Sequence, residues 1–308
     1  MNKEELGNKI KIMRERKGVS RERFCGDESE LTVRQLARIE SGHSFPSFSK
    51  LDYIHKKLGV PLSKIVDDNH VVLPQEYLAL KLRFMKYNTY RNPQRMAIKE
   101  NMLEDMYEKF YETLPEEEQI IIDIYQATVD VNHSLNLLFG EPIIEEYFEQ
   151  VKRKTRYNLV DLMVIRLYFI YLVDSEGVEY QKKLVQKFIK HSTKYFDYGD
   201  VYMIEYGISF YIQCLTVMLH HKDYEQIELV FELVEELLDY NGEISDRSIY
   251  FMLQAKYSYF GRGDSVTANS YYDKAIMGAK FSENAALQKR LEEEWEKDKK
   301  KFISENTI

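Results

Sequence analysis

The sequence predicts an all-α protein of two parts, a small N-terminal domain followed by a solenoid of helical pairs. Apolar residues recur at helical spacing through most of the 308 residues, while the alternation typical of strands is nearly absent. Turn signals separate the helical stretches, as in arrays of paired helices. The stretch 67–74, "DDNHVVLP", breaks the helical period, and we expect it to be a linker.

Residues 1–66 contain five short helical stretches. The first has an apolar stripe and stops at Gly18, and Ser20 then caps a short second helix. Thr32 begins the third helix, Ser47 begins the fourth, and a last small helix follows. A tight turn joins the second and third helices, which is the arrangement of a helix-turn-helix unit.

The third helix has one apolar face and one strongly polar face. Thr32 and Gln35 form a Thr-x-x-Gln capping box, and Gly42 is a natural stop. Arg34, Gln35 and Arg38 point away from the apolar face. Such a helix suits the DNA major groove, where Arg pairs with guanine and Gln with adenine. Taken alone, the helix can also be interpreted as an exposed surface helix whose arginines are solvated.

The neighbouring helices favour the DNA-binding interpretation. We expect Arg34 and Arg38 to read bases, and we expect the short second helix to hold phosphates through its hydroxyl and its two arginines. The full set of expected DNA-contacting residues is Ser20, Arg21, Arg23, Thr32, Arg34, Gln35 and Arg38.

A set of residues spread over this domain recurs in a known family. They are Gly18, Ser20, Leu36, the run Arg38 to Gly42, Pro46, Ser47, Leu51, Leu58 and Gly59. At these positions the sequence resembles the XRE (Cro/repressor-like) DNA-binding domain. It departs from that pattern at Phe24-Cys25, where Leu-Ala is common, and at Arg21, which replaces a phosphate-contacting Gln. Glu40 is expected to tie helices together rather than to touch DNA.

Cysteine content and hydropathy indicate the compartment. Only 2 cysteines occur, Cys25 and Cys214, so no disulfide framework exists and a reducing cytosol fits. We find no signal peptide and no apolar run long enough to span a bilayer; "LMVIRLYFIYLV" is too short and contains Arg166. We therefore expect a cytoplasmic protein that does not enter the membrane.

Charge is unevenly distributed along the chain. Residues 1–70 hold 14 Lys and Arg against 11 Asp and Glu, a net of +3, while the remainder holds 29 against 40, a net of −11. An acidic body can attract a basic DNA-reading domain of the same chain. We expect Arg34 to be shared between DNA and such an autoinhibitory contact, with Glu116, Glu117 and Glu118 as the partner surface.

Residues 75–281 form a degenerate array of helical pairs. The clearest pair, 250–277, has small residues where two helices would cross and tyrosines elsewhere, and it resembles a tetratricopeptide (TPR) repeat. The stretches that begin at Gly177 and His221 resemble the same half-repeat more weakly. The positions that match within the clearest pair are Ala255, Tyr259, Gly263, Asp264, Ala268, Tyr272 and Ala275.

No pattern supports an enzyme, a cofactor or a metal site. The 7 histidines are scattered without a His-Glu-x-x-His, and no Gly-x-x-x-x-Gly-Lys-Ser/Thr loop occurs. The run Glu116 to Glu118 follows a proline and is typical of a helix N-terminus rather than of a catalytic carboxylate pair. We therefore expect neither catalysis nor a cofactor.

Three charged residues interrupt apolar helical stretches. Lys99 falls in the apolar stripe of a helix expected from Pro93 to Tyr111, and Arg166 and Glu205 lie in strongly apolar stretches. One interpretation is that Lys99 reaches solvent and that Arg166 pairs with an acid in the core. The other is that all three line a concave groove and contact a ligand, with Lys99 suited to a ligand carboxylate such as a peptide C-terminus.

Several strings along the chain resemble one family of regulators. They are "SRERFCG", "ELTVRQLARIESG", "YRNP", "YEKFYETLPEEE", "FEQVKRKTRY", "AKYSYF" and "NSYYDKAI". They resemble the Rgg group of the RRNPP class of peptide-sensing regulators, and within it the competence regulators of streptococci. The resemblance implies a cytoplasmic activator that binds an imported short hydrophobic pheromone peptide, dimerises and binds a palindromic promoter. It also implies that a basic side chain, here Lys99, recognises the peptide's C-terminal carboxylate.

The segment 282–308 is expected to be a C-terminal helix. Leu287, Leu291 and Trp295 recur at i, i+4 and i+8 on an otherwise charged helix. This apolar edge either caps the last helical pair or is lent to a second chain. With the implied peptide switch, we expect a monomer without peptide and a homodimer with it.

Two other classes of protein share this architecture. A helix-turn-helix repressor that answers a small molecule would need a closed pocket rather than an open groove. A TPR scaffold that binds a protein partner would not need the polar third helix.

Overall fold

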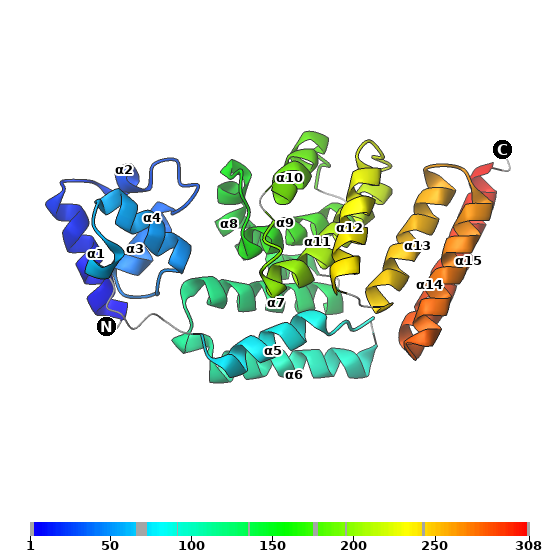
Figure 1. Ribbon diagram of the computed structural model, residues 1–308, viewed down its shortest axis with the longest axis horizontal. Helices are drawn as coiled ribbons and strands as arrows, with labels where there is room; N and C mark the ends of the chain where they lie inside the picture. The colour runs from blue at the N-terminus through cyan, green and yellow to red at the C-terminus, as the bar shows by residue number, and fades with distance from the viewer. Residues whose placement is uncertain are drawn as a thin grey trace. The chain divides into compact units, whose positions relative to one another are not determined.

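The computed structural model describes residues 3–65, 73–90, 92–134, 136–174, 178–194, 196–241 and 244–306. Across these ranges the chain forms fifteen α-helices and three short 3-10 helices, with no strand, so the predicted all-α class is confirmed (Figure 1). Most of the predicted linker, 67–74, lies outside the described residues. The chain divides into two compact units, Met1–Phe84 with Glu100–Val164, and Met85–Lys99 with Ile165–Ile308.

The N-terminal helices of the first unit begin at the predicted caps. The Ser20 hydroxyl accepts a hydrogen bond from the Arg23 amide, and Ser47 accepts one from Lys50 in the same way. Gly59 ends the fourth helix in the left-handed conformation, with a φ of 59°. The helices are α1 (Lys3–Arg16), α2 (Arg21–Cys25), α3 (Val33–Glu40), α4 (Phe48–Leu58) and η1 (Leu62–Lys64).

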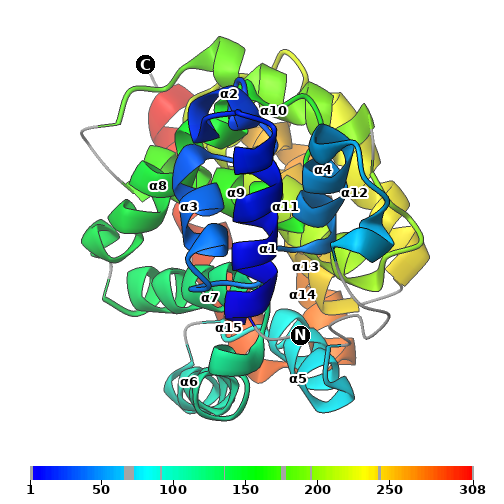
Figure 2. The same ribbon diagram turned by 90° about the vertical axis from the view of Figure 1, so that its left-hand side faces the viewer.

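These helices share one apolar core, in which α1 packs on both α3 and α4 (Figure 2). Gly7 permits this, because a Cβ at this position would lie 2.0 Å from the Ile39 carbonyl oxygen. The predicted buried face of α3 is confirmed, since Leu36 and Ile39 are fully buried. Burial of this face leaves the opposite face of α3, with its arginines, for other contacts.

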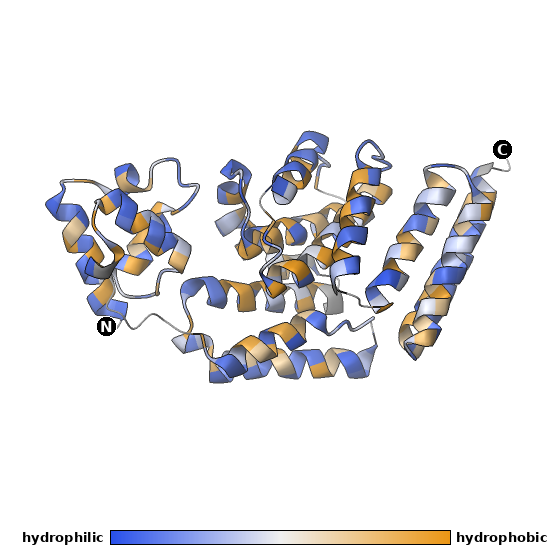
Figure 3. Ribbon diagram, viewed as in Figure 1, coloured by the Kyte–Doolittle hydropathy of each residue, from blue (hydrophilic) through white to orange (hydrophobic). Residues whose placement is uncertain are grey.

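The rest of the first unit consists of helices that bury one face each. Figure 3 shows apolar and polar residues mixed along α5, α6 and α7, as expected for such helices. Ile121, Ile122 and Ile124 of α7 are buried. The elements are α5 (Gln75–Lys86), α6 (Pro93–Lys109), η2 (Tyr111–Thr113), α7 (Glu116–Ser134), η3 (Leu137–Gly140), α8 (Glu141–Arg153) and α9 (Leu159–Asp174), of which α5, α6 and α9 continue into the second unit.

The second unit contains the TPR-like pair. Ala255, Ala268 and Ala275 are fully buried where α13 and α14 cross, and Tyr272 is buried beside them. Asp264 caps α14 through the amides of Val266 and Thr267. The remaining helices of this unit are α10 (Lys182–Lys194), α11 (Val201–His220), α12 (Ile227–Asn241), α13 (Ile244–Phe260), α14 (Ser265–Phe281) and α15 (Ala285–Asn306).

One sequence-based expectation about apolar runs was wrong. Helix α11, Val201–His220, is long and apolar enough to cross a membrane by length and composition, although Glu205 interrupts it. Because 67% of its most apolar window is buried inside the protein, it has the character of a core helix.

The apolar edge of α15 is covered within the same chain. Leu287 and Leu291 are 2% and 1% exposed and pack on α14. The Trp295 ring stacks on Tyr272 with ring centroids 5.6 Å apart, and its indole N–H donates to Asn269 at 3.0 Å. In the single chain, α15 therefore caps the last helical pair, which is the first of the two roles that the sequence left open.

Candidate functional site

Helix α3 begins with the predicted capping box. The Thr32 hydroxyl accepts from the Gln35 amide at 3.1 Å, and the Gln35 side-chain oxygen accepts from the Thr32 amide at 3.1 Å. The side-chain NH2 of Gln35 also donates to the Gln150 side chain of α8 at 3.3 Å, and Gln35 is only 3% exposed. Gln35 is therefore buried rather than open on the polar face of α3, because the capping box and Gln150 engage both ends of its side-chain amide.

Glu40, at the end of α3, joins three helices. Its buried carboxylate accepts from Arg14 Nε at 2.5 Å and Nη2 at 2.9 Å, and from Arg21 Nε at 2.8 Å. The hydrogen bond to Glu40 raises the pKa of the Arg14 guanidinium. The expectation that Glu40 ties helices together is confirmed. Arg21, predicted to hold a phosphate, keeps a half-exposed side chain while bound to Glu40.

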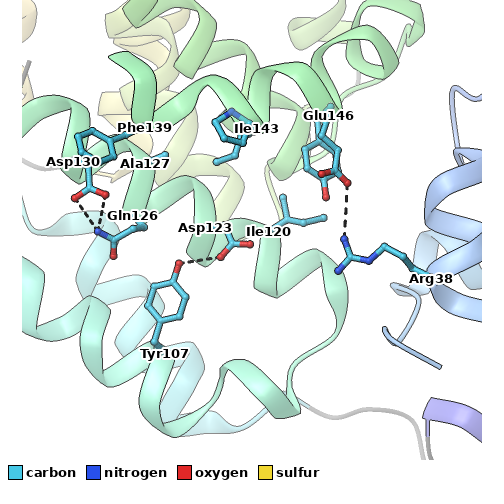
Figure 4. A pocket seen from close by; sticks show the side chains of 12 residues that line it. Arg38, Tyr107, Ile120, Asp123, Gln126, Ala127, Asp130, Phe139, Ile143 and Glu146 are labelled. Atoms are coloured by element: carbon cyan, nitrogen blue, oxygen red, sulfur yellow. Dashed lines mark hydrogen bonds and ion pairs between the residues drawn. The ribbon is translucent and has the colours of Figure 1, made fainter. Parts of the chain in front are cut away.

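The two arginines predicted to read bases lie against carboxylates of α7 and α8. Arg34 Nη2 is 3.4 Å from Glu146 Oε2, although 69% of the Arg34 side chain remains exposed. Arg38 lies between two acids, because its Nε is 3.7 Å from Glu116 Oε1 and its Nη1 is 3.9 Å from Glu146 Oε1. Figure 4 shows the pair with Glu146. The polar face of α3 is therefore occupied by protein groups of opposite charge.

Further contacts join the N-terminal helices to α7 and α8. Lys50 of α4 is 3.2 Å from Glu116 Oε2, and the Glu116 amide donates to the Phe45 carbonyl at 3.1 Å. The Gln150 side chain donates to the Ser29 carbonyl at 3.1 Å. We call the surface made by Glu116, Glu146 and Gln150 the acidic docking face.

The three glutamates that were predicted as the partner surface contact three different groups. Glu116 faces Arg38, but Glu117 accepts from Asn158 Nδ2 at 2.9 Å, and Glu118 pairs with Lys81 at 2.7 Å. Successive residues of a helix point about 100° apart, so three adjacent glutamates do not share one face.

Glu146 and Gln150 were missed by the sequence analysis. They stand at i and i+4 on α8, so they share a face. Nothing in the sequence shows that this face of α8 contacts α3, because the contact joins residues more than a hundred positions apart.

Lys99 and Arg166 come close to one another in the second unit. Lys99 Nζ donates to the Tyr87 carbonyl at 2.9 Å. Burial, together with the positive charges of Arg166 and Arg95, lowers the pKa of Lys99 to about 7. Two of the three predicted ligand-contacting residues therefore contribute to one cationic cluster.

Arg166 and Glu205 differ in their surroundings. The Arg166 guanidinium lies 5.8 Å from the centroid of the Tyr206 ring, and its buried Nε has no hydrogen-bond partner among the described residues. Among the described residues Arg166 has no ion pair, so the acid partner that one of the two interpretations required is not found there. Glu205 is 7% exposed and pairs with Lys86 at 3.6 Å.

Metal binding has no ready site in the part of the chain that the structure describes. Within it, no group of three or more His, Cys, Asp or Glu side chains is arranged to hold a metal ion. Cys25 and Cys214 are buried, and burial raises the pKa of both thiols, to about 12 for Cys25.

Comparison with known proteins places this arrangement among regulators. The family described as ComR tetratricopeptide matches residues 74–295. No curated protein sequence matches the chain.

Solved structures resemble the chain over nearly its full length. The apo form of the competence regulator ComR from Streptococcus vestibularis has a TM-score of 0.83 and 32% identity, covering 96% of this chain and 98% of that chain. Apo ComR from S. thermophilus has a TM-score of 0.83 and 33% identity, covering 96% and 99%. S. thermophilus ComR in complex with DNA and its signalling peptide ComS has a TM-score of 0.67 and 34% identity, covering 95% and 99%. By TM-score, the fold of this chain superposes better on these two apo forms than on the complex with DNA and peptide.

Proposed function

The chain belongs to the ComR family of peptide-sensing transcription regulators, within the Rgg group of the RRNPP class, and on this premise we propose that it is a peptide-activated transcriptional activator of competence. It is not an enzyme, since the family consists of transcription regulators. In the proposed cycle, a short hydrophobic peptide binds in the cytoplasm, the protein dimerises, and the dimer binds a palindromic promoter.

The position of Arg34 and Arg38 is the observation that carries the proposal. Both side chains belong to the helix that suits the major groove, and both pair with carboxylates of the acidic docking face. One guanidinium cannot pair with these carboxylates and with a guanine edge at the same time. DNA binding and docking therefore exclude one another, and docking corresponds to the resting state.

The proposed peptide site uses the cationic cluster of the second unit. Lys99 and Arg166 offer positive charge in a half-buried setting, where a carboxylate interacts more strongly than in water. The proposed role of Lys99 is to bind the C-terminal carboxylate, with Arg166 beside it. Glu205 and its partner Lys86 would contact a polar group further along the peptide.

Dimerisation is proposed to use the C-terminal helix. The contacts of Leu287, Leu291 and Trp295 with α13 and α14 are made within one chain here. The same contacts can form between two chains if α15 is exchanged, because an exchange replaces each contact with an identical one.

We expect Arg38→Ala to weaken binding to the promoter by about 1–3 kcal/mol, the value of a bidentate base contact. Fluorescence anisotropy with the peptide-loaded protein measures this loss. Arg16→Ala, at an exposed position of α1, is the matched control and should bind like the parent. Parent-like binding of Arg38→Ala would remove α3 as the reading helix.

We expect Glu146→Lys to raise promoter activity without peptide, because it places a positive charge beside both docked arginines. Glu146 suits charge reversal better than Glu116, whose side chain is 1% exposed. Glu149→Lys, on an exposed position of the same helix, is the control. Equal basal reporter activity in the two variants would mean that the acidic docking face does not hold the protein in its resting state.

We expect peptide affinity to fall as the pH rises through about 7. The peptide carboxylate stabilises the charged form of Lys99, so binding takes up a proton wherever free Lys99 is neutral, which is above its pKa of about 7. The loss approaches about tenfold per pH unit at most, and affinity levels off below about pH 6.

Calorimetry with the cognate peptide, identified by mass spectrometry of peptides that co-purify with the protein, measures this dependence. Lys99→Arg keeps a charge over the same range and should bind without the pH dependence, since Arg does not titrate there. An unchanged dependence in Lys99→Arg would show that another group titrates.

We expect light scattering to report a monomer without peptide and a dimer with it. Trp295→Ala removes the stacking on Tyr272 and the hydrogen bond to Asn269, and it should weaken the peptide-induced dimer. Val266→Ala, at an exposed position of α14, is the control. A constitutive dimer in the parent would contradict the switch, and a full-strength dimer in Trp295→Ala would exclude this edge of α15.

A further inference from the structure

A cavity of about 300 Å³ opens beside Arg38 in the first unit (Figure 4). Its floor is one face of α7, from which Asp123 and Asp130 project. The opposite wall comes from η3 and α8, with Phe139 and Ile143. The volume lies at the lower end of the range for sites that take a small organic molecule. Tyr107, Gln126, Glu146 and Tyr147 complete most of the lining.

The lining combines apolar surface with an excess of negative charge. Asp123, Asp130 and Glu146 are three carboxylates, and Arg38 is the one cation among the described lining residues. Isoleucine, alanine, proline and aromatic side chains form the remaining walls. A site of this composition favours a molecule with a positive head and an apolar stem.

Neutral donors already orient the two aspartates. The Tyr107 and Tyr111 hydroxyls donate to the two oxygens of Asp123 at 2.9 and 3.0 Å. The Gln126 side chain donates to both oxygens of Asp130 at 2.9 Å. These bonds fix both carboxylates in place, and the neutral tyrosine hydroxyls do not neutralise the charge of Asp123.

Asp123 carries a charge that its surroundings do not fully compensate. Burial raises the pKa of Asp123 despite the two tyrosine hydroxyls, and the negative charge of Glu146 raises it further. The positive charge of Arg38 acts in the opposite direction, but Arg38 is closer to Glu116, at 3.7 Å, and to Glu146, at 3.9 Å. A second cation between Asp123 and Glu146 would relieve this repulsion.

We propose that this pocket binds a small organic cation, an amine or a guanidinium on a short apolar stem. The positive head lies between Asp123 and Glu146, and the stem lies against Phe139 and Ile143. The occupant is an organic cation rather than a metal ion, because a metal ion would leave the apolar wall of the cavity unused.

Because the pocket lies beside Arg38, a bound ligand would affect the contact between α3 and the acidic docking face. The head of the ligand competes with Arg38 for Glu146, so occupancy weakens the contact of α3 with the acidic docking face. The coupling of ligand binding to α3 rests on the proposed function, whereas the binding of the cation to the pocket does not.

Calorimetry on the full chain tests binding with 2-phenylethylamine, which is charged at neutral pH. We expect saturable binding to one site with a dissociation constant of about 1 mM or lower. The control ligand 2-phenylethanol has the same stem without the charge and should bind at least about tenfold more weakly. Equal binding of the two ligands, or no saturable binding of the amine, overturns the proposal.

Variants locate the site. Glu146→Gln should weaken amine binding about tenfold, while Glu149→Gln, on the exposed side of α8, should leave it unchanged. Arg38→Ala removes the competing cation and should tighten binding. Asp123→Asn should weaken binding as well, with its thermal unfolding recorded to confirm that it folds. Parent-like binding in both Glu146→Gln and Asp123→Asn overturns the assignment of the amine to this pocket.

Promoter binding in the presence of the amine separates the two proposals. Amine binding that raises DNA binding supports both the pocket and its coupling to the docked α3. Amine binding without a change in DNA binding keeps the pocket and overturns the coupling. If the amine does not bind while Glu146→Lys raises basal activity, the pocket proposal falls and the proposed resting state stands.

Discussion

The buried carboxylate of Glu40 holds the N-terminal helices together, and the rest of the site depends on it. It accepts hydrogen bonds from Arg14 of α1 and Arg21 of α2, and it stands at the end of α3. Removal of one partner from a buried ion pair typically costs about 3–5 kcal/mol, because the other charge is left without compensation. The network therefore sets the direction in which α3 points its arginines toward the acidic docking face.

The contact with the acidic docking face consists of long ion pairs whose arginines stay partly exposed. The ion pairs of Arg34 and Arg38 span 3.4 to 3.9 Å, and both arginines remain at least 41% exposed at their side chains. An exposed pair such as Arg34–Glu146 contributes roughly 0–1 kcal/mol. A contact built from several weak pairs can be displaced by a ligand with a modest preference for the open state.

The cationic cluster of the second unit follows a different principle. Lys99 and Arg166 repel each other, and burial adds to the cost of their charges. An arrangement that is unfavourable alone becomes favourable when an anion enters, which supports the proposed binding of a carboxylate at this cluster. In the pocket beside Arg38 the excess charge is negative, since carboxylates outnumber cations in its lining, and a cation would relieve the repulsion.

Local chemistry was readable from the sequence by itself. The capping box of Thr32 and Gln35, the buried stripe of Leu36 and Ile39 and the crossing alanines of the TPR-like pair all depend on residues close together along the chain. Such signals follow from helix geometry and side-chain volume, so the all-α class, the polar face of α3 and the chain's family resemblance were predicted. The choice of Lys99 as a charge in an apolar stripe came from the same periodicity.

Only the tertiary structure decided which distant residues meet. It selected Glu116 from a run of three glutamates, added Glu146 and Gln150, turned the Gln35 side chain toward α8 and set Arg166 beside Lys99. It also decided that the apolar edge of α15 is covered within one chain. Helical periodicity states which residues share a face, but the face that each helix turns toward another depends on packing between segments far apart in sequence, which no local pattern encodes.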